Sequence, residues 1–390
     1  MSKLEELINE LCPDGVEYKK IDVLLKEKHI KLITPSIKLK SKDYLEEGLI
    51  PIVSQELEYI SGYTNVSDNN LPEDKYVCFG DHSEHIKYID FQFVQGADGL
   101  KIFKSCNDEL NIKYIYYVFC NFYTRHNNYE RHTKYLKDTE IPVPPLPVQE
   151  EIVRILDSFT ELTAELTAEL TARNKQYEYY RATLMNFNED VEWVPLGSIG
   201  RVSMCKRILK NQTTSEGDIP FYKIGTFGKK ADAFISRQLF EEYKEKYSFP
   251  KKGTILISAS GTIGRTVVYD GEPAYYQDSN IIWLEHDESK ILNSYLYYCY
   301  QLNPWRIAEG GTISRLYNDS VHKTKIPVPY SKDKEKSLKA QQRIVDILDR
   351  FDTLCNDIST GLPAEIDKRQ KQYEYYRDKL LTFKRLEVND

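Results

Sequence analysis

The amino-acid sequence predicts an α+β fold in which two globular regions each precede a long helix, with an internal pseudo-twofold repeat. Three observations carry this prediction. The string KQYEYYR occurs twice, at Lys175–Arg181 and at Lys371–Arg377. The segment from Val148 to Val194 contains no glycine or proline, which permits one long helix. The regions upstream of the two strings hold short β-type runs between turn residues.

The repeat extends well beyond KQYEYYR. Upstream of the two copies, QEEIVRILDSF at Gln149–Phe159 matches QQRIVDILDRF at Gln341–Phe351. A proline-rich string beginning IPVP precedes each of these, at Ile141–Pro147 and at Ile326–Tyr330. A seven-residue identity within a collinear series of weaker matches indicates a duplicated unit.

The length of 390 residues exceeds that of one ordinary domain. We expect two globular domains at residues 1–145 and 188–330, and two helical regions at residues 146–187 and 331–390. The prolines that precede each helical region support these boundaries, because proline disfavours helix in the residue before it.

Apolar residues in the first helical region recur at spacings of three or four, or of seven, as they do in a coiled-coil seam. Its members are Ile152, Leu156, Phe159, Leu166, Leu170, Tyr177, Tyr180, Leu184 and Phe187. We therefore expect a continuous helix from Gln149 to Asn186.

The second helical region repeats this pattern. Its members are Ile344, Ile347 or Leu348, Phe351, Leu354, Ile358, Tyr373, Tyr376, Leu380 and Phe383. Gly361-Leu362-Pro363 should kink or break the second helix. Two matching seams favour packing of the helices on each other, and the alternative is that each helix packs only on its own domain.

Both globular regions are expected to combine strands with helices. The β-type runs are KYVCFG, FQFVQ and LKIFK in the first region, and GTILISASG, TVVYD and NIIWLE in the second. Segments near Tyr114–Tyr123 and Ser294–Gln301 are expected to be helical. The glycine-rich SASGTIGRT at Ser258–Thr266 is interpreted as a tight turn between two strands.

The bulk composition argues against several classes of protein. A formal net charge of −7 argues against a non-specific nucleic-acid coat protein, which would be strongly basic. No run of about 18 apolar residues occurs and the first residues lack a signal-peptide core, so we expect a cytoplasmic protein without a membrane span. The seven cysteines are widely spaced and form no CxxC pair, which favours reduced, mostly buried thiols over a zinc site.

The sequence holds none of the common catalytic or metal-binding motifs. GxxxxGK[ST], GxGxxG and HExxH do not occur, and Asn303–Trp305 lacks the second proline of an adenine-methyltransferase motif. Two segments keep a nuclease open as an alternative function. Pro13–Lys19 contains the residue types of a restriction-nuclease motif, but its two acidic residues are too close together in sequence. His82 and His85 lie beside acidic residues in a segment that we interpret as a polar loop, with a metal site as the alternative. We predict no catalytic residue and no metal ligand.

Basic residues cluster in both globular regions and are mixed with Tyr, Asn and His. The clusters are Lys31–Lys42, Thr124–Lys137, Cys205–Lys210, Gly228–Lys230 and Ser314–Lys325. These residue types suit phosphate contacts and hydrogen bonds to base edges. A solvated basic face is the alternative for any single cluster. However, one cluster directly precedes the IPVP string in each half, and this symmetry favours contact with DNA.

Taken together, these motifs resemble the specificity subunits of type I restriction–modification systems over essentially the whole chain. The resemblance rests on the two IPVP and KQYEYYR stretches, the LCPDGVEYKK start and a TAEL repeat. It implies two target-recognition domains held apart by an antiparallel coiled coil, each recognising one half of a split double-stranded DNA sequence. It also implies two adenine methyltransferase subunits and translocating restriction subunits as partners. Catalysis, with S-adenosylmethionine, ATP and Mg²⁺, would lie in those partners, and no cofactor is expected in this chain.

The resemblance and the local chemistry together nominate individual residues. The candidate DNA contacts are Lys38, Lys40, Arg125, His126, Arg131 and Lys134 in the first domain, and Lys206, Arg207, Lys229, Arg265, Arg315, Tyr317 and Lys323 in the second. The candidate subunit contacts are Gln149, Tyr177, Tyr180, Gln341, Tyr373 and Tyr376. A coiled-coil adaptor that binds only protein remains a third possible function.

A tandem repeat, TAELTAELTA, occupies Thr163–Ala172 in the first helical region. Phe159 and Lys175 are 16 positions apart, whereas Phe351 and Lys371 are 20 apart, so the two helical regions differ by 20 − 16 = 4 residues, one repeat unit. A four-residue insertion rotates a helix by roughly 40° beyond a full turn, which a coiled coil tolerates as a stutter. We interpret the repeat as a ruler that sets the spacer between two half-sites; the alternative is an inconsequential helix filler.

Overall fold

The computed structural model describes residues 2–35, 38–66, 70–96, 99–185, 191–305 and 315–387. The chain forms two units that do not correspond to its two halves. Unit 1 comprises Met1–Thr167 together with Glu365–Asp390, and unit 2 comprises Ala168–Ala364. The last helix of the chain therefore belongs to the unit that contains the first globular region.

Unit 1 is built on two small sheets and a β-ribbon. A four-stranded antiparallel sheet has the order β2-β8-β5-β6, a three-stranded sheet has the order β4-β3-β7, and β1 pairs with β9. The elements, in chain order, are α1 (Lys3–Leu11), β1 (Glu17–Lys20), α2 (Ile21–Lys26), β2 (Ile30–Ile33), a 3₁₀ turn (Ser41–Asp43), β3 (Ile50–Val53), β4 (Gly62–Thr64), β5 (Tyr76–Gly80), β6 (Ile86–Ile89), β7 (Val94–Gln95), β8 (Leu100–Ser105), α3 (Ile112–Phe122), α4 (Thr133–Asp138), β9 (Glu140–Val143) and α5 (Leu146–Leu184).

Helix α3 supplies the core of unit 1 by packing on the four-stranded sheet. Its apolar residues recur at helical spacing, so Ile115, Val118 and Phe119 are all buried on one side. Phe119 meets Phe103 of β8 edge to face, with ring centroids 5.4 Å apart. The Asn111 side chain caps the start of the helix by accepting hydrogen bonds from two backbone N–H groups.

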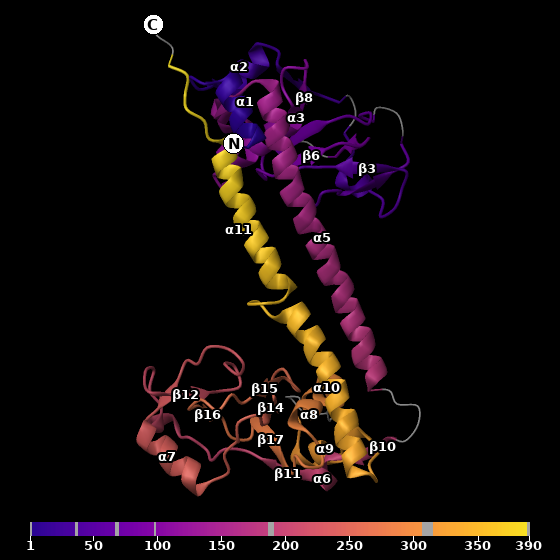
Figure 1. The fold of residues 1–390 in the computed structure, drawn as a ribbon, viewed down its shortest axis with the longest axis vertical. Helices are drawn as coiled ribbons and strands as arrows, with labels where there is room; N and C mark the ends of the chain where they lie inside the picture. The colour runs from indigo at the N-terminus through magenta and orange to yellow at the C-terminus, as the bar shows by residue number, and fades with distance from the viewer. Residues whose placement is uncertain are drawn as a thin grey trace. The chain divides into compact units, whose positions relative to one another are not determined.

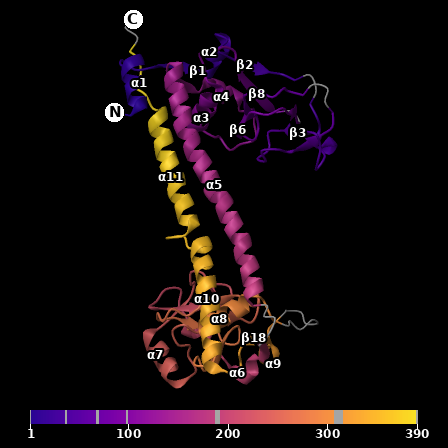
Figure 2. The same ribbon diagram turned by 45° about the vertical axis from the view of Figure 1, so that its right-hand side comes forward.

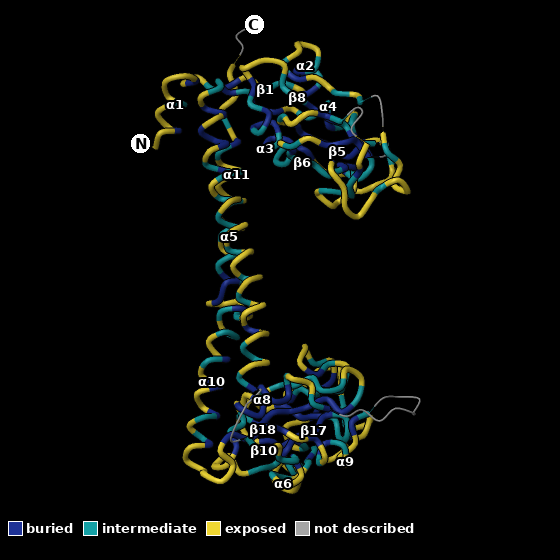
Figure 3. The backbone as a smooth tube through the Cα atoms, turned by 90° about the vertical axis from the view of Figure 1, so that its right-hand side faces the viewer, coloured by how far each residue is buried: buried dark blue, intermediate teal, exposed yellow. Residues whose placement is uncertain are grey.

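Unit 2 repeats this arrangement with sheet orders β11-β17-β14-β15 and β13-β12-β16, and with β10 paired to β18. Its elements are β10 (Val191–Pro195), α6 (Leu196–Ile199), β11 (Gly200–Ser203), a 3₁₀ turn (Lys210–Gln212), β12 (Ile219–Tyr222), β13 (Phe234–Ile235), α7 (Arg237–Lys246), β14 (Ile255–Ser258), β15 (Thr266–Val268), β16 (Tyr275–Tyr276), β17 (Ile281–His286), α8 (Asn293–Gln301), α9 (Asn318–Lys323), β18 (Lys325–Pro329) and α10 (Lys334–Asn356), followed by α11 (Leu362–Leu381), most of which belongs to unit 1. Helix α7 has no helical equivalent among the described residues between β4 and β5. Buried residues concentrate in the strands around β17 (Figure 3).

The three long helices agree with the predicted pattern in their main features. Helix α5 covers the expected span as far as Leu184, and Asn186 and Phe187 lie outside the described residues. The predicted break at Gly361 is confirmed, because α10 ends at Asn356 and α11 begins at Leu362. A Cβ at Gly361 would stand 2.4 Å from a backbone oxygen, which explains the glycine there.

Aromatic residues join the helices within each unit. In unit 1, α5 lies beside α11 (Figure 1, Figure 2), and Phe159 stacks on Tyr376 with centroids 5.4 Å apart. In unit 2, Tyr177 and Tyr180 of α5 both stack on Phe351 of α10, at 6.1 and 5.3 Å. The predicted seam position Ile358 is wrong: it is 86% exposed, because α10 has already ended.

The segment Pro13–Lys19, considered above as a nuclease string, has a structural role instead. Gly15 takes a φ of +114° and a Cβ there would collide with the Lys384 carbonyl oxygen, so the turn requires glycine. The next residue, Val16, donates its N–H to that carbonyl at 2.9 Å. Tyr18 donates its hydroxyl to the Phe383 carbonyl at 3.1 Å. The beginning of the chain is therefore tied to the residues that follow α11.

No helix among the described residues is long and apolar enough to cross a membrane. All seven cysteines are free thiols, and five of them are buried. Burial raises the pKa of Cys205 to about 12, so that thiol stays protonated at neutral pH.

A buried glutamine fixes the start of α5 to the first globular region. Gln149 is 0% exposed, and its Oε1 accepts from the Asn111 N–H at 2.9 Å. Its Nε2 donates to the carbonyls of Glu109 and Pro144, at 3.2 and 2.7 Å. This corrects the prediction that Gln149 contacts another subunit, because the side chain is enclosed and its hydrogen bonds are satisfied within the unit.

Gln341 makes the equivalent contacts about two turns into α10. It is also 0% exposed, and its Oε1 accepts from the Leu292 N–H at 2.9 Å. Its Nε2 donates to the Lys290 carbonyl and to the Ser337 hydroxyl, both at 3.0 Å. The prediction of Gln341 as a subunit contact is corrected for the same reason.

Each long helix is also joined to its domain by a tyrosine–aspartate hydrogen bond. Tyr117 of α3 donates its hydroxyl to Asp157 of α5 at 2.6 Å, and Tyr298 of α8 donates to Asp349 of α10 at 2.5 Å. With the buried glutamines, these bonds show that the internal repeat extends to individual hydrogen bonds.

We predict that Gln149→Ala and Gln341→Ala each lower the free energy of unfolding by about 1–3 kcal/mol, because each leaves buried backbone groups without a partner. Urea denaturation would measure the change, and hydrogen exchange would assign it to one unit. Gln342→Ala is the matched control, since Gln342 is the exposed neighbour of Gln341 on the same helix. Equal stability of the Gln341 and Gln342 variants would contradict the prediction.

Candidate nucleic-acid interface

A basic hollow of about 530 Å³ lies on unit 1 beside the end of β2 and the start of α4. Five cationic side chains line it: Lys38, Lys101, Arg131, Lys134 and Lys137. Asp81 is the one carboxylate among its lining residues. Three of the predicted DNA contacts of the first domain, from segments about 100 residues apart, are thus brought together, and the hollow has the charge required to hold phosphate groups.

Lys101 and Lys137 were missed by the sequence prediction. Lys101 lies on β8 between buried Leu100 and Ile102, so its side chain faces the opposite side of the strand. A lysine within an otherwise apolar strand indicates that its side chain lies on the more exposed face of the strand. The sequence does not indicate which residues lie against that face. Lys137 belonged to a predicted basic cluster but was not singled out.

Buried Asp81 sits under this hollow and organises it. Its Oδ1 accepts hydrogen bonds from the Thr133 N–H at 2.9 Å and the Thr133 hydroxyl at 2.5 Å. Its Oδ2 lies 3.5 Å from the Lys101 ammonium. Burial raises the pKa of Asp81, but the hydrogen bonds from Thr133 and the charge of Lys101 outweigh burial, so the pKa is lowered overall.

Glu84, three residues further on, is a second buried carboxylate and is 3% exposed. Its Oε2 accepts from the Tyr123 hydroxyl at 2.6 Å and from the His126 N–H at 2.8 Å, and its Oε1 accepts from the Asn127 N–H at 2.8 Å. Burial raises the pKa of Glu84, but these donors outweigh burial and lower the pKa overall. The carboxylate is therefore ionised at neutral pH.

The loop at residues 124–131 carries the other two predicted contacts of this cluster. Arg125 is exposed, and its charge lies close enough to His85 to add to the effect of burial in lowering the pKa of His85. His126 stacks on Tyr135 with centroids 4.0 Å apart. Neither residue lines the hollow, and neither does Lys40, which is exposed just before the 3₁₀ turn.

The histidine segment considered above for a metal site supports the same loop. The His82 Nδ1 donates to the Glu130 carbonyl at 3.0 Å, and its ring stacks on Tyr129 at 5.3 Å. Among the described residues there is no group of three or more His, Cys, Asp or Glu side chains that could hold a metal ion.

In unit 2, two predicted arginines converge on the segment at residues 278–280. The Arg207 Nε donates to the Asp278 carboxylate at 2.9 Å, and the Arg315 Nη2 donates to the Ser279 carbonyl at 2.6 Å. Ser279 has a φ of +54°, which is unusual for a residue other than glycine. The neighbouring Lys206 is exposed, with its ammonium over the Tyr247 ring at 5.1 Å.

The glycine-rich segment Ser258–Thr266 forms the tight turn between β14 and β15, as predicted. The Arg265 Nη1 donates to the Phe227 carbonyl at 3.0 Å, which places Arg265 beside the loop that carries exposed Lys229. Tyr317 and Lys323 are exposed at the two ends of α9. Ser314, the first residue of that predicted cluster, lies outside the described residues.

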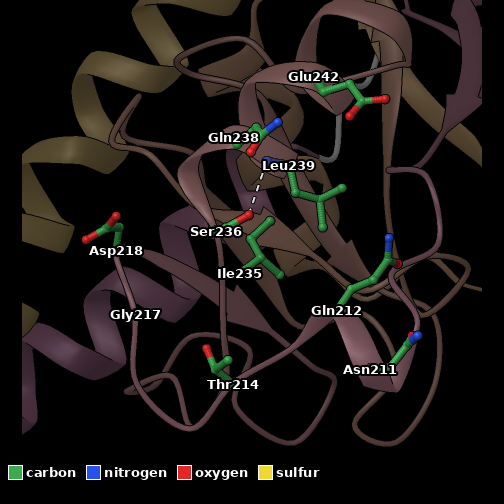
Figure 4. A pocket seen from close by; sticks show the side chains of 10 residues that line it. All are labelled: Asn211, Gln212, Thr214, Gly217, Asp218, Ile235, Ser236, Gln238, Leu239 and Glu242. Carbon is green, nitrogen blue, oxygen red and sulfur yellow. Dashed lines mark hydrogen bonds between the residues drawn. The ribbon is translucent and has the colours of Figure 1, made fainter.

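A second hollow in unit 2, of about 620 Å³, lies at the start of α7 and was not predicted (Figure 4). The Ser236 hydroxyl caps the helix by accepting from the Leu239 N–H at 3.3 Å. The lining includes the amides of Asn211, Gln212 and Gln238 and the carboxylates of Asp218 and Glu242, and its residues include no cation. This lining suits hydrogen bonding but not the binding of a phosphate group.

The family model for the type I restriction modification DNA specificity domain matches the chain twice, at residues 30–173 and 188–368. A Haemophilus influenzae protein named as a type I restriction enzyme specificity subunit is 50% identical over 343 residues, which are 84% of this chain and 86% of the relative. The EcoR124I/EcoR124II specificity subunit of Escherichia coli is 33% identical over 423 aligned positions, covering 100% of this chain and 98% of the relative.

Solved structures resemble the fold. The crystal structure of a type I S subunit from M. genitalium superposes with a TM-score of 0.56 at 17% identity, covering 94% of this chain and 96% of that one. A chain from a study of complex assembly and conformational transition in a type I restriction–modification system superposes with a TM-score of 0.52 at 15% identity, covering 95% and 98%. The duplicated fold, the basic surface of unit 1 and these matches agree: the chain belongs to the type I restriction–modification DNA specificity family, whose members recognise a DNA target and are not themselves catalytic.

Proposed function

We propose that this chain recognises a bipartite DNA duplex, with each globular region binding one half-site. The observation that carries the proposal is the basic hollow of unit 1, which gathers five cations from distant segments over a buried carboxylate. The arginines around residues 278–280 are the corresponding candidates in unit 2. A net charge of −7 is compatible with this function, because phosphate contacts require a local rather than a global excess of cations.

Under this proposal, residues 1–145 and 188–330 are the target-recognition domains, and residues 146–187 and 331–390 are the helical regions. The partners are two DNA adenine methyltransferase subunits and restriction subunits, which would supply S-adenosylmethionine, ATP and Mg²⁺ chemistry in the cytoplasm. The second tyrosine of each KQYEYYR string supports a twice-repeated docking surface: Tyr179 and Tyr375 are 64% and 62% exposed, whereas the buried Gln149 and Gln341 do not suit that role.

The function is tested by duplex binding of the purified chain, alone and with a candidate methyltransferase subunit. The probe is a duplex carrying the methylated-adenine motif mapped in the source cells, and a shuffled duplex is the control. Specific binding without cleavage by the chain alone is expected. Cleavage by the chain alone would favour a nuclease, and absence of duplex binding with every partner would favour a protein-only adaptor.

Arg131→Ala and Arg315→Ala are each predicted to weaken binding of the specific duplex by about 1–3 kcal/mol if the two arginines contact bases. Titration against specific and shuffled duplexes would measure this. Equal losses on both would identify phosphate contacts instead. Arg154→Ala is the control for the lost charge in unit 1, because Arg154 is exposed on α5 and does not line the hollow.

We also propose that the long helices form an antiparallel coiled coil and that TAELTAELTA acts as a ruler within it. The stacking of Phe159 on Tyr376 in unit 1 and of Tyr177 on Phe351 in unit 2 supports pairing at two places along α5. Between these places, Leu166 and Leu170 are half-buried while most other residues of the repeat are exposed. A segment with so few packed side chains can change length without disturbing either domain.

Inserting one TAEL unit after Leu170 is predicted to lengthen the spacer between the half-sites and to leave both half-sites unchanged, because the helix grows by about 6 Å. Mapping of methylated adenines in cells that carry the variant would measure the spacer. An equally helical unit, EAKA, should act in the same way if length alone matters. A changed half-site, or an unchanged spacer, would be inconsistent with a ruler.

A further inference from the structure

We infer that Glu84, helped by Asp81, is a positioning residue that holds the loop at residues 124–131 in the conformation that recognises the first half-site. The inference rests on the proposed function and assigns a specific device to it. Neither carboxylate need touch DNA for this role. Each would act through the loop that it binds.

The Glu84 carboxylate binds the beginning of the loop. Glu84 lies in the turn between β5 and β6, about 40 positions before the loop in sequence. Among the described residues, its oxygens accept hydrogen bonds from the Tyr123 hydroxyl, which directly precedes the loop, and from the N–H groups of His126 and Asn127 in its first half. A buried, ionised carboxylate with several donors makes strong hydrogen bonds.

The far end of the loop is bound by Asp81, which lies in the same turn between β5 and β6 as Glu84. The Asp81 carbonyl accepts from the His132 N–H at 2.8 Å, and its carboxylate accepts from Thr133 through both the N–H and the hydroxyl. His132 is 0% exposed. The loop backbone is therefore fixed on both sides by a five-residue turn, and few of its conformations remain accessible.

Most of the residues between these two attachments are exposed to solvent. Every residue from 124 to 129 is exposed, as is Arg131. Tyr129 is 91% exposed, although its ring is ordered by stacking on His82. The backbone of this loop is fixed by hydrogen bonds to the turn between β5 and β6, and its Arg, His, Asn and Tyr side chains face solvent. Such a loop suits recognition of base edges and phosphates. It contributes little to the core of the unit.

Backbone strain at Glu84 supports a role for the side chain itself. Glu84 has a φ of +58° and Asn127 has a φ of +54°, a region in which a side chain with a Cβ is disfavoured. Glycine would serve the turn better if geometry alone mattered. What glycine lacks is the carboxylate that accepts from the loop.

The direction in which duplex affinity changes on removal of the Glu84 charge distinguishes a positioning role from simple repulsion of phosphate groups. A carboxylate close to a DNA-binding surface repels phosphate groups, so removal of its charge alone should tighten binding of any duplex. Removal of a positioning residue should instead weaken binding of the correct half-site, because ordering the loop then costs entropy on binding. The two roles therefore predict changes of opposite direction.

The experiment uses the full chain in complex with its methyltransferase subunits and a duplex library with randomised positions. Glu84→Gln keeps the shape and removes the charge, Glu84→Gly also removes the strain, and Tyr123→Phe removes one donor without a change of charge. Glu6→Gln is the control, because Glu6 is an exposed carboxylate on α1. Sequencing of the bound fraction gives the enrichment of each base in each half-site.

Glu84→Gln and Glu84→Gly are expected to reduce base enrichment in one half-site by about tenfold, and Tyr123→Phe by a smaller factor. The other half-site should be enriched as in wild type, which also shows that each variant complex is folded. Glu6→Gln should leave both half-sites unchanged. Because Tyr123→Phe is conservative, it keeps the test decisive even if a Glu84 variant fails to fold.

Two results would overturn the positioning role while leaving the proposed function intact: uniformly tighter binding of all duplexes by Glu84→Gln, or full discrimination by Glu84→Gly. In both, the wild-type complex still selects two half-sites. A wild-type complex that selects no motif would instead refute the proposed function, and the positioning role with it.

Discussion

The anchoring of α5 and α10 by one fully buried glutamine each is the contact on which the rest of the arrangement depends. Gln149, in the first turn of α5, and Gln341, in α10, join these helices to the loops before α3 and α8. The bonds from Tyr117 to Asp157 and from Tyr298 to Asp349 add a second point about two turns further along. Two points fix the direction of a rod. Each of these two helices is thus fixed at its beginning to the globular region that precedes it along the chain.

The globular regions divide stability and recognition between different parts. Helix and sheet residues such as Phe103 and Phe119 form cores that need no polar partner. The surface loops are held instead by hydrogen bonds, which buried Glu84 accepts in unit 1 and half-buried Arg315 donates to the Ser279 carbonyl in unit 2. Loops held in this way can change their exposed residues without disturbing the core, which suits a domain that recognises a DNA target.

The sequence predicted the repeat, the course of the long helices and the break at Gly361 because these depend on local patterns: periodicity, proline and glycine. It could not predict the burial of Gln149, since glutamine is usually exposed and only its tertiary neighbours enclose it. Nor could it identify Glu84. Its carboxylate accepts from donors some 40 positions away in sequence, and a glutamate at a given position does not predict a left-handed backbone there. Lys101 was hidden for a related reason, because a strand pattern assigns a face but not what that face meets.

The assignment of residues 365–390 to unit 1 has a consequence for the order of folding. During synthesis, every residue of unit 2 leaves the ribosome before residues 365–390 do, so the second unit can complete its core while the first still lacks most of α11. Leu381, which is fully buried in the core of unit 1, arrives after more than 200 residues of intervening chain. Truncation of the chain before α11 would therefore damage unit 1, which contains the first globular region, and spare unit 2.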